Sequence, residues 1–584
     1  MRNAKIVCTL GPASDSRETI RNLADAGMTV ARLNASHGSH EDRAALVDRV
    51  RSVDDETENP LAVMVDLQGP EIRTAPIDDT VHLDSGSEIR FVQGETATPE
   101  EVGLSLPIEG VEPGDSILLD DGRIQTTVQR VEGDAVVARV DDGGDLAGRK
   151  GVNIPGVDLD LDVVTEKDRR DLELAAERDA DFVAASFVRD ADDVYEVGGV
   201  LEELNADIPI IAKIERAGAV ENLDGIIDAA YGVMVARGDL GVECPMEDVP
   251  MIQKRIIRNC RDAGVPVITA TEMLDSMVHA RRPTRAEASD VANAVIDGTD
   301  GVMLSGETAI GDHPVRVVEA MDRIVRQVER SAEYEELREQ RVPAAADART
   351  DALARSARYL ARDIGASAIV AASESGYTAL KTAKFRPGVP VVASTPNDRV
   401  RRQLALSWGV NAQYAPLSDE GADAVIENAV QAALNAGVAE SGDTVVVLSG
   451  MMTELEGAST TNMLKVHVAA ETLATGRSVV GDRVIGPVAR TADGDLSSVP
   501  EGAILTLDET FDGEFAGDTA KLGGVVDASP GVTGYPAMVA RELGIPMISD
   551  ATLEVPDGTV VTLDAERGVV YEGDVASAEA DRIR

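Results

Sequence analysis

Apolar runs in the first half of the chain repeatedly end in charged or hydroxyl side chains. Lys213 and Glu215 close one run, Asp239 closes the next, and Thr271 with Glu272 closes the run after that. A lysine presents a point charge to phosphate, and two carboxylates can share a hard cation such as Mg²⁺ or Mn²⁺ with waters and substrate oxygens. The pattern predicts a site for an anion and a divalent cation; the alternative for either acid alone is a salt bridge at the rim.

Other runs end in the same way, and their polar residues extend the candidate site. They are Arg32, Asn34 and Ser36 after the second run, Asp66 and then Arg73 after the third, Ser186 after the fourth, and Ser305 and Glu307 after the eighth. Four basic groups, Arg32, Arg73, Lys150 and Lys213, stand out in a very acidic chain. Because arginine forks and lysine ammonium groups bind phosphate, they indicate an anionic, phosphorylated substrate.

Two further features lie beside these runs. In ARGDLG (236–241), Gly238 and Asp239 stand where a helix can begin, and free N–H groups there can hold a carboxylate. His37 in LNASHGS lies next to the second run. A lone histidine is usually a capping or packing residue, so its spacing assigns it no acid/base role.

Short strand-like runs must position these side chains, and they alternate with helical stretches. The runs cover 5–10, 30–34, 62–67, 182–187, 210–215, 232–240, 266–274 and 301–307. Amphipathic segments such as RETIRNLADAG and EDRAALVDRVRSV follow most of them. Eight β/α units predict an α/β protein with a parallel (β/α)8 TIM barrel, whose strands carry the polar residues to one mouth. An open doubly wound sheet gives the same alternation.

The remaining segments predict three more domains. Residues 70–151 read as short strands and turns, which indicates a small β lid domain inserted after the third strand. The barrel is expected at 1–69 and 152–342, with a closing helix over 321–341. An α/β domain is expected at 343–475, with strands at ASAIVAAS, VPVVAST and DTVVVLSG. A β-rich domain with one helix, AMVARELG, is expected at 476–584.

Composition constrains partners and compartment. The chain has 584 residues, with 104 Asp and Glu against 55 Lys and Arg, and a formal net charge of −49. Such a surface repels phosphate backbones and anionic lipids, which argues against nucleic acid or membrane as the main partner. The first residues lack a signal-peptide pattern, and Cys8, Cys244 and Cys260 have no CxxC spacing, so a reducing cytoplasm is expected.

The acidic excess and the scarcity of lysine indicate the salt concentration to which the protein is adapted. Only nine of the 55 basic residues are lysine, and the acidic residues are dispersed along the whole chain. Concentrated salt screens such self-repulsion over a few ångströms, so the composition predicts a salt-adapted, halophilic protein. A merely acidic mesophilic protein is the alternative.

Nine segments now resemble the pyruvate kinase family, in family order and at family spacing. They are KIVCTLGPAS, VARLNASHG, DLQGPEIRT, KGVNIPG, AKIER, VARGDLGVE, VITATEML, RPTRAEASDVANAV and LSGETAIGDHP. The resemblance covers nearly all of 1–475. It implies a (β/α)8 barrel with a small β-barrel lid, an α/β regulatory domain and a homotetramer. The implied reaction transfers a phosphoryl group from phosphoenolpyruvate to ADP, giving pyruvate and ATP.

The resemblance also implies roles for the residues at the substrate. Lys213 is expected to neutralise the transferring phosphoryl group, with Ser186 beside the substrate. Glu215 and Asp239 are expected to hold Mg²⁺ or Mn²⁺. The expected carboxylate site consists of the N–H groups of Gly238 and Asp239 with Thr271, which also lies near the enolate face that takes a proton. Ser305 and Glu307 are expected in the surroundings of the proton relay.

Further implied roles concern phosphates, K⁺ and the nucleotide. Arg32, Arg73 and Lys150 are expected to bind phosphates, with Lys150 at the lid hinge. The implied K⁺ site consists of Asn34, Ser36, Asp66 and the carbonyl of Leu67. The implied nucleotide site consists of Pro12, Asn34, His37, Arg73 and Lys150.

Three departures from the family pattern leave questions open. Ile310 stands where many members carry lysine toward the nucleotide, and Glu272 stands where glutamine is usual, so nucleotide choice is open. The K⁺ requirement is open too, because Glu71 resembles K⁺-dependent members whereas Leu67 and Gln68 resemble K⁺-independent ones.

In the α/β domain, SESGYTA (373–379) and KFRPGVP (384–390) resemble the loop that binds a phosphorylated allosteric effector. The implied effector residues are Ser373, Ser375, Gly376 and Thr378. An ordinary βα turn is the alternative for this segment.

Residues 478–584 resemble the phosphohistidine swivelling domain that some bacterial members carry. Tyr535 stands where swivelling domains carry the phosphorylated histidine, and Pro536 after it predicts an extended backbone at Tyr535. A phosphoenolpyruvate synthase or dikinase-like enzyme is one alternative, but it needs a histidine in 478–584, and that stretch contains none. A non-catalytic homologue is the other, and it is expected to have lost Lys213, Glu215 or Asp239.

Overall fold

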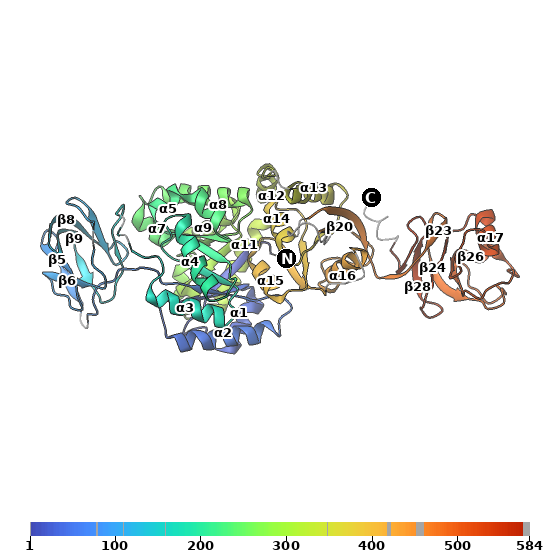
Figure 1. Cartoon of the computed structure of the whole chain (residues 1–584), viewed down its shortest axis with the longest axis horizontal. Coiled ribbons are helices and arrows are strands. Elements are labelled where there is room, and N and C mark those ends of the chain that lie inside the picture. The colour runs from blue at the N-terminus through green and yellow to red at the C-terminus, as the bar shows by residue number, and fades with distance from the viewer. Residues whose placement is uncertain are drawn as a thin grey trace. The chain divides into compact units, whose positions relative to one another are not determined.

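The computed structural model describes residues 2–77, 80–108, 110–157, 159, 161–346, 349–416, 422–450 and 461–575. The chain divides into two compact units, which are described separately: Met1–Ala344 with Arg401–Val410, and Ala345–Val400 with Asn411–Arg584. Figure 1 labels their elements. Within the described residues, no helix combines the length and the apolar character that a membrane span needs.

Eight parallel strands close into a barrel in the first unit, in the order β1-β16-β15-β14-β13-β12-β3-β2. They are β1 (Lys5–Thr9), β2 (Val30–Asn34), β3 (Ala62–Asp66), β12 (Phe182–Ala185), β13 (Ile210–Ile214), β14 (Gly232–Ala236), β15 (Val267–Ala270) and β16 (Gly301–Leu304). The predicted (β/α)8 barrel is confirmed, and the open sheet was the wrong alternative. Except for β2, each predicted run continued past the true end of its strand, because it included the first residues of the following loop or helix, apolar ones such as Leu10 and polar ones such as Glu215.

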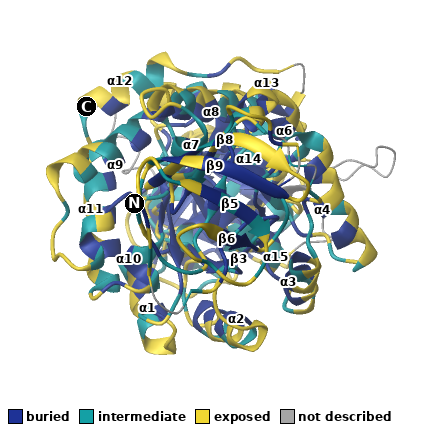
Figure 2. Ribbon diagram, turned by 90° about the vertical axis from the view of Figure 1, so that its left-hand side faces the viewer, coloured by how far each residue is buried: buried dark blue, intermediate teal, exposed yellow. Residues whose placement is uncertain are grey.

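Helices follow the strands around the barrel. They are α1 (Arg17–Ala26), α2 (His40–Asp54), α3 (Glu166–Glu177), α4 (Ala191–Glu203), α5 (Ala217–Glu221), α6 (Leu223–Ala229), α7 (Arg237–Glu243), α8 (Val249–Ala263), η1 (Asp275–Val278), α9 (Arg285–Asp297), α10 (Gly306–Ala309), α11 (Pro314–Glu329) and α12 (Ala332–Gln340). Figure 2 shows exposed outer faces on these helices and buried residues toward the strands.

The predicted closing helix over 321–341 is wrong as a single helix. Helix α11 ends at Glu329, and Ser331 caps α12 by accepting a hydrogen bond from the N–H of Tyr334. Serine at an N-cap satisfies a free donor of the new helix, so it favours a fresh start over continuation.

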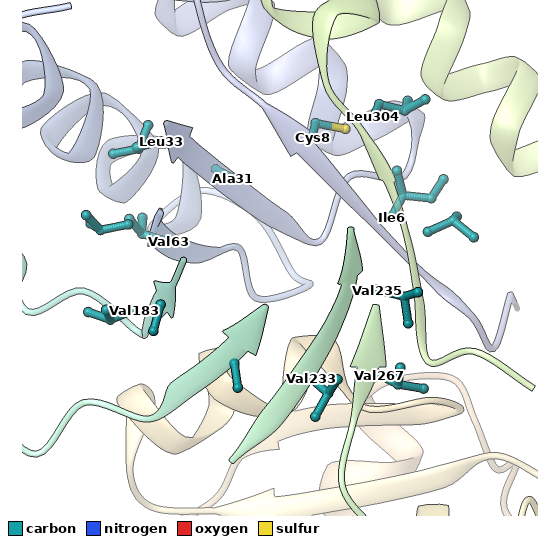
Figure 3. Close-up of a cluster of buried hydrophobic side chains, with 14 of the residues drawn as sticks. Ile6, Cys8, Ala31, Leu33, Val63, Val183, Val233, Val235, Val267 and Leu304 are labelled. Carbon is teal, nitrogen blue, oxygen red and sulfur yellow. The ribbon is translucent and has the colours of Figure 1, made fainter. Parts of the chain in front are cut away.

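Alternate residues of the barrel strands face two different apolar layers. Ile6, Cys8, Ala31 and Leu33 pack in the layer shared with the surrounding helices (Figure 3). Their strand neighbours belong to a separate inner cluster, which includes Val7, Val30, Met64, Ile211, Met234 and Ile268. This alternation with a period of two explains why the runs are apolar throughout: both faces of a barrel strand are buried.

A segment from far along the chain packs against the amino end of the barrel. Residues 401–410 belong to the first unit and include the end of α15 (Asp398–Gln403) and η2 (Leu404–Leu406). Leu406 joins the inner barrel cluster, and Trp408, only 1% exposed, joins the outer one. The Nζ of Lys5 donates to the carbonyl of Val410 at 2.7 Å. The sequence analysis did not predict this packing.

The segment between β3 and α3 forms two antiparallel-rich sheets. One pairs β4 (Val81–Leu83) with β10 (Gly144–Leu146), and the other has the order β11-β7-β8-β9-β5-β6. Its strands are β5 (Glu88–Gln93), β6 (Glu101–Leu104), β7 (Ser116–Leu119), β8 (Ile124–Glu132), β9 (Ala135–Asp142) and β11 (Val152–Asn153). They enclose a separate apolar core that includes Leu83, Ile89, Phe91 and Leu119.

The second unit begins with a five-stranded sheet of order β19-β18-β17-β20-β21. Its elements are α13 (Arg349–Asp363), β17 (Ala368–Ala372), α14 (Tyr377–Lys384), β18 (Val391–Thr395), β19 (Val410–Tyr414), α16 (Ala422–Asn435), β20 (Asp443–Ser449) and β21 (Met463–Ala469). The predicted α/β domain is confirmed, although strands β19 and β21 were not predicted.

An eight-stranded sheet completes the second unit, in the order β22-β29-β28-β24-β25-β26-β27-β23. Its elements are β22 (Thr472–Thr475), β23 (Arg477–Val480), β24 (Arg483–Arg490), β25 (Ala503–Leu507), η3 (Thr519–Lys521), β26 (Leu522–Asp527), α17 (Tyr535–Leu543), β27 (Met547–Ser549), β28 (Val560–Asp564) and β29 (Val569–Glu572). The extended backbone predicted for Tyr535 is wrong. Tyr535 is the first residue of α17, where a following proline is tolerated because the first helical N–H groups have no partner.

Candidate active site

Lys213 occupies the centre of a buried ionic cluster at the carboxyl ends of the strands. Its Nζ lies 2.8 Å from Ser186 Oγ, 2.7 Å from Glu215 Oε1 and 3.4 Å from Asp66 Oδ1. Asp66 Oδ2 accepts from Arg32 Nε at 2.5 Å. The structure thus brings together five predicted site residues from four strand ends, here called the Lys213 cluster: Arg32, Asp66, Ser186, Lys213 and Glu215.

The protonation states of this cluster follow from its packing. Burial alone lowers the pKa of Lys213, but Asp66 and Glu215 outweigh it and hold that pKa above its usual value. Burial likewise raises the pKa of Asp66, but Arg32 and Lys213 outweigh it and hold that pKa below its usual range. Lys213 is therefore an ammonium group fixed in place, able to stabilise negative charge that develops on a bound phosphoryl group.

Asp239 lies beside this cluster on a helix, which corrects its predicted position at a strand end. Strand β14 stops at Ala236, and Asp239 is the third residue of α7. Burial and then the nearby Glu215 raise the pKa of Asp239 to about 7. Two carboxylates that repel each other at a barrel mouth form a donor set suited to a hard divalent cation. Glu215 and Asp239 therefore fit Mg²⁺ or Mn²⁺.

The remaining ligands of such a cation must come from elsewhere. Among the residues that the structure describes, no group of three or more His, Cys, Asp or Glu side chains is placed to hold a metal ion. A site with two protein carboxylates leaves the other positions to water and substrate oxygens, which is the usual pattern for Mg²⁺ bound with phosphates.

Oxygen atoms also gather where the K⁺ site was predicted. Asn34 and Asp66 are register partners on β2 and β3, and Oδ1 of Asp66 is buried and accepts no hydrogen bond from the described residues. Asn34 Oδ1 accepts from the N–H of Ser36 at 3.0 Å, and the carbonyl of Leu67 accepts from Ser186 Oγ at 2.7 Å. A buried carboxylate oxygen that lies 3.4 Å from the Lys213 ammonium, amid neutral oxygens, fits a monovalent cation.

Thr271 and Gly238 meet across two neighbouring β/α loops. The N–H of Gly238 donates to Thr271 Oγ1 at 2.7 Å, and that hydroxyl donates to the carbonyl of Ala270 at 2.8 Å. Thr271 has a positive φ of 66°, which is rare for a β-branched residue. The structure thus brings together two of the residues predicted to bind a carboxylate.

Glu307 connects the last two β/α loops. Its Oε2 accepts from the N–H of Ser305 at 2.6 Å, and its Oε1 accepts from the N–H of Leu274 at 3.1 Å. Burial raises the pKa of Glu307 above its usual range. The two N–H bonds fix this carboxyl group between the loops at the barrel mouth.

Arg73 and Lys150 lie on two paired backbone segments at the base of the inserted β domain, and each pairs with an acid of that domain. Arg73 donates to Glu71 Oε2 from Nε at 3.0 Å and from a terminal nitrogen at 2.7 Å. Lys150 Nζ lies 2.8 Å from Asp120 Oδ1. In the described part of the chain, no hydrogen bond or ion pair joins either basic residue to the Lys213 cluster.

Two of the residues predicted at the nucleotide, Pro12 and His37, lie on exposed loops, whereas Asn34 ends β2 and is half-buried. Pro12 and His37 are exposed, and the carbonyl of His37 accepts from Arg43 at 3.0 Å. Ile310 is 64% exposed. Exposed side chains are free to contact a ligand.

One residue of this region was missed by the sequence analysis. Arg237 begins α7 and donates to the backbone carbonyls of Ala270 and Thr271. The motif ARGDLG was noticed for its N–H groups, but a contact between a side chain and a distant backbone leaves no spacing signal.

The predicted effector loop opens helix α14. Gly376 is the N-cap of α14 with a φ of 76°, and the N–H of Ser373 donates to the carbonyl of Ser394 at 3.0 Å. Thr378 is buried with its Oγ1 2.8 Å from Oγ1 of Thr461, whereas Ser375 is exposed. The structure brings these four residues to one loop and helix start.

In the last domain, Tyr535 is held by a neighbouring segment. Its hydroxyl accepts from the N–H of Phe515 at 3.2 Å, and the two rings meet edge to face with centroids 5.6 Å apart. The side chain that stands in the place of the histidine is thus a packing residue.

Comparison with known proteins gives three consecutive family matches. The family described as "Pyruvate kinase, barrel domain" matches residues 1–318, and "Pyruvate kinase, alpha/beta domain" matches 351–467. The family described as "PEP-utilising enzyme, mobile domain" matches 499–568.

Curated relatives match over almost their whole length. The chain is 43% identical to a pyruvate kinase of Geobacillus stearothermophilus, with 98% of this chain and 99% of the relative covered. Pyruvate kinases of Bacillus licheniformis and Staphylococcus epidermidis are each 41% identical, with the same coverage. The barrel, the Lys213 cluster and these matches agree, and the chain therefore belongs to the pyruvate kinase family of phosphotransferases.

Proposed function

We propose that this chain catalyses the last step of glycolysis, the transfer of a phosphoryl group from phosphoenolpyruvate to ADP, giving pyruvate and ATP. One observation carries the proposal: the ammonium group of Lys213 is fixed among Ser186, Asp66 and Glu215 at the barrel mouth, with Asp239 beside it. This arrangement supplies a fixed positive charge for a phosphoryl group in transfer and a pair of carboxylates for a divalent cation.

Each group has a distinct part in the proposed reaction. Glu215 and Asp239 hold Mg²⁺ or Mn²⁺, which supplies Lewis-acid polarisation of phosphoryl oxygens when bound. Lys213 and Arg32 stabilise the charge on the phosphoryl group, and Arg73 and Lys150 bind phosphates from the lid side. The N–H groups at the start of α7 and the Thr271 hydroxyl hold the substrate carboxylate and orient the enolate carbon for protonation.

A coupled assay tests this proposal directly. Phosphoenolpyruvate and ADP are supplied with Mg²⁺ and varied KCl, and pyruvate is detected by its reduction with NADH. Pyruvate should form only when ADP and a divalent cation are both present. Release of pyruvate without ADP, or no pyruvate in any condition, would contradict the proposed transfer.

We also propose that K⁺ is required, bound by Asn34, Ser36, Asp66 and the Leu67 carbonyl. A lysine at position 71 could replace the cation with its own ammonium group, whereas Glu71 adds negative charge; this charge outweighs the opposite indication from Leu67 and Gln68. Rates in K⁺ should exceed rates in tetramethylammonium at matched ionic strength. Glu71→Lys should narrow that difference, and equal rates of the unaltered chain in both cations would contradict the proposal.

Further proposals concern regulation and assembly. The loop of Ser373, Ser375, Gly376 and Thr378 is proposed to bind a phosphorylated effector, because a helix start offers N–H groups and hydroxyls to phosphate. A homotetramer in the cytoplasm is proposed from the family resemblance.

Salt adaptation is proposed from the charge of −49 with nine lysines. Carboxylate repulsion should lower the thermal unfolding midpoint as KCl falls from molar to low concentration. A midpoint that does not depend on salt would refute this adaptation.

The C-terminal domain is proposed to be catalytically inert and kept for packing. A tyrosine ring has no nitrogen and so offers no neutral nitrogen nucleophile, and here the hydroxyl of Tyr535 accepts a hydrogen bond from the N–H of Phe515. Radiolabelled phosphoenolpyruvate should leave no label on 478–584. A phosphorylated residue in that stretch would revive the dikinase-like alternative.

A further inference from the structure

Arg237 joins the two loops that contain the predicted carboxylate-binding groups. It is the first residue of α7, next to Gly238, and its side chain is only 14% exposed. Its Nε donates to the carbonyl of Ala270 at 3.0 Å, and a terminal nitrogen donates to the carbonyl of Thr271 at 2.8 Å. One guanidinium group thus holds two consecutive carbonyls at the end of β15.

Those carbonyls flank a strained stretch of backbone. Thr271 has a φ of 66° and Glu272 a φ of 52°, so two consecutive residues with side chains are left-handed. Such a conformation is unfavourable for a residue with a side chain and persists only where surrounding contacts enforce it. The Thr271 carbonyl belongs to the peptide that links the two strained residues, so its bond to Arg237 opposes relaxation of both.

Arg237 is itself held firmly from the other side. Its two terminal nitrogens lie 2.7 Å from Oδ1 and 2.7 Å from Oδ2 of Asp290 on α9. Gln253 Oε1 accepts a further bond at 3.3 Å. A planar fork can serve carbonyls and a carboxylate together, whereas a lysine ammonium is a single point charge and cannot reproduce this set.

The held backbone fixes a functional hydroxyl. Thr271 Oγ1 donates to the same Ala270 carbonyl that Arg237 holds, at 2.8 Å, and accepts from the N–H of Gly238 at 2.7 Å. The direction of this hydroxyl therefore depends on the left-handed conformation of Thr271. If the loop relaxed, Oγ1 would leave the N–H groups at the start of α7.

We propose that Arg237 is a positioning residue for the substrate carboxylate: it holds Thr271 in its strained conformation, so that the hydroxyl and the N–H groups of α7 form one binding site. The inference rests on the proposed function and deepens it. Arg237 acts through Thr271 and Gly238, and it touches no reacting atom.

The first test is Arg237→Lys in the full chain, which removes the planar guanidinium group but keeps the positive charge. Misplacement of binding groups by about 1 Å can cost on the order of 10²-fold in rate, so kcat/KM for phosphoenolpyruvate should fall by about that factor. The KM for phosphoenolpyruvate should rise while the KM for ADP stays unchanged. Partial unfolding cannot produce this difference, because it lowers the active fraction and leaves both KM values as they were.

A second variant tests the contacts of the fork itself. In Arg237→Ala, added guanidinium chloride at millimolar concentration should lower the KM for phosphoenolpyruvate toward its original value, whereas equal KCl should not. If both variants keep the original KM for phosphoenolpyruvate, Arg237 has no positioning role.

Arg51→Lys is the matched control. Arg51 also donates to a carboxylate and a backbone carbonyl, those of Asp181 and Asp179, but at the opposite end of the barrel. Its replacement should leave the KM values for phosphoenolpyruvate and ADP unchanged. If Arg51→Lys raised the KM for phosphoenolpyruvate as much as Arg237→Lys does, the rise would not be specific to Arg237. An unaltered chain that forms no pyruvate would instead overturn the proposed function.

Discussion

Both ends of the barrel bury carboxylates, but those at the amino end are more fully paired with donors than those at the carboxyl end. At the amino end, Asp181 accepts from the N–H of Val63 at 2.7 Å, from Arg51 at 2.8 Å and from Arg402 at 2.8 Å. At the carboxyl end, Oδ1 of Asp66 accepts no hydrogen bond from the described residues, and the pKa of Asp239 is raised to about 7 by burial and by Glu215.

This difference indicates that Asp181 holds the fold together, whereas the carboxylates at the carboxyl end are suited to binding a ligand. Asp181 has donors on both oxygens, so its charge is neutralised within the folded chain and ties residues 401–410 to the barrel. At the other end Arg32 and Lys213 compensate Asp66, but Asp239 beside Glu215 remains incompletely compensated, which leaves affinity for a cation. Asp181 is therefore a paired structural anchor, whereas Asp239 is a carboxylate whose charge a bound cation could balance.

The largest effect on the free energy of unfolding is expected at the amino end of the barrel, at Asp181. Asp181→Ala leaves Arg51, Arg402 and the Val63 N–H without their acceptor, and breaking a buried ion pair typically costs about 3–5 kcal/mol. Urea unfolding followed by the fluorescence of Trp408, the single tryptophan, should shift to lower urea. The KM values for phosphoenolpyruvate and for ADP should stay unchanged. An unshifted transition would show that Asp181 does not anchor this end.

At the binding end, Lys213→Met should affect turnover more than affinity. Loss of a fixed positive charge that stabilises the transition state lowers kcat by about 10² or more. Lys254→Met is the matched control, because Lys254 also pairs with an acid, Asp297, but on the outer helices. Steady-state rates with phosphoenolpyruvate and ADP decide the outcome, and near-normal turnover of Lys213→Met removes it from the mechanism.

Sequence alone predicted most of the charged residues at the carboxyl end of the barrel and little of the packing at its amino end. Lys213, Glu215 and Asp239 were found because apolar runs end in charge, and parallel strands bring such ends together. Strand ends were placed too late because the first residues of the following loop or helix were counted with the strand, as Arg237 to Asp239 were after β14. The packing of 401–410 could not be predicted, since Leu406 and Trp408 are apolar like any core residue and their partners lie hundreds of positions away.

Lys5 adds a pH dependence to the anchoring end. Burial, and then the charge of Arg2, lowers the pKa of Lys5 from 10.5 to about 7. Between these values the unfolded chain binds a proton that the folded chain does not, so stability should rise with pH over this interval.

A variant isolates this contribution. The urea midpoint of the unaltered chain should rise between pH 7 and pH 9.5 relative to that of Lys5→Met, again by Trp408 fluorescence. Other titrating groups are common to both chains and cancel in the difference. Parallel pH profiles of the two chains would mean that Lys5 keeps its proton in the fold.

The smallest effect is expected for an ion pair that has the same chemistry but lies in solvent. Arg130 donates to both carboxylate oxygens of Glu88 on the lid sheet, at 2.7 and 2.9 Å, and to Glu132 at 2.6 Å. Water and salt screen exposed pairs, so good geometry there adds little to stability. Arg130→Gln should leave the thermal midpoint within experimental error in molar KCl. A drop comparable to that of Asp181→Ala would show that geometry, and not burial, decides the strength of these ion pairs, and the contrast between the two barrel ends would then need another cause.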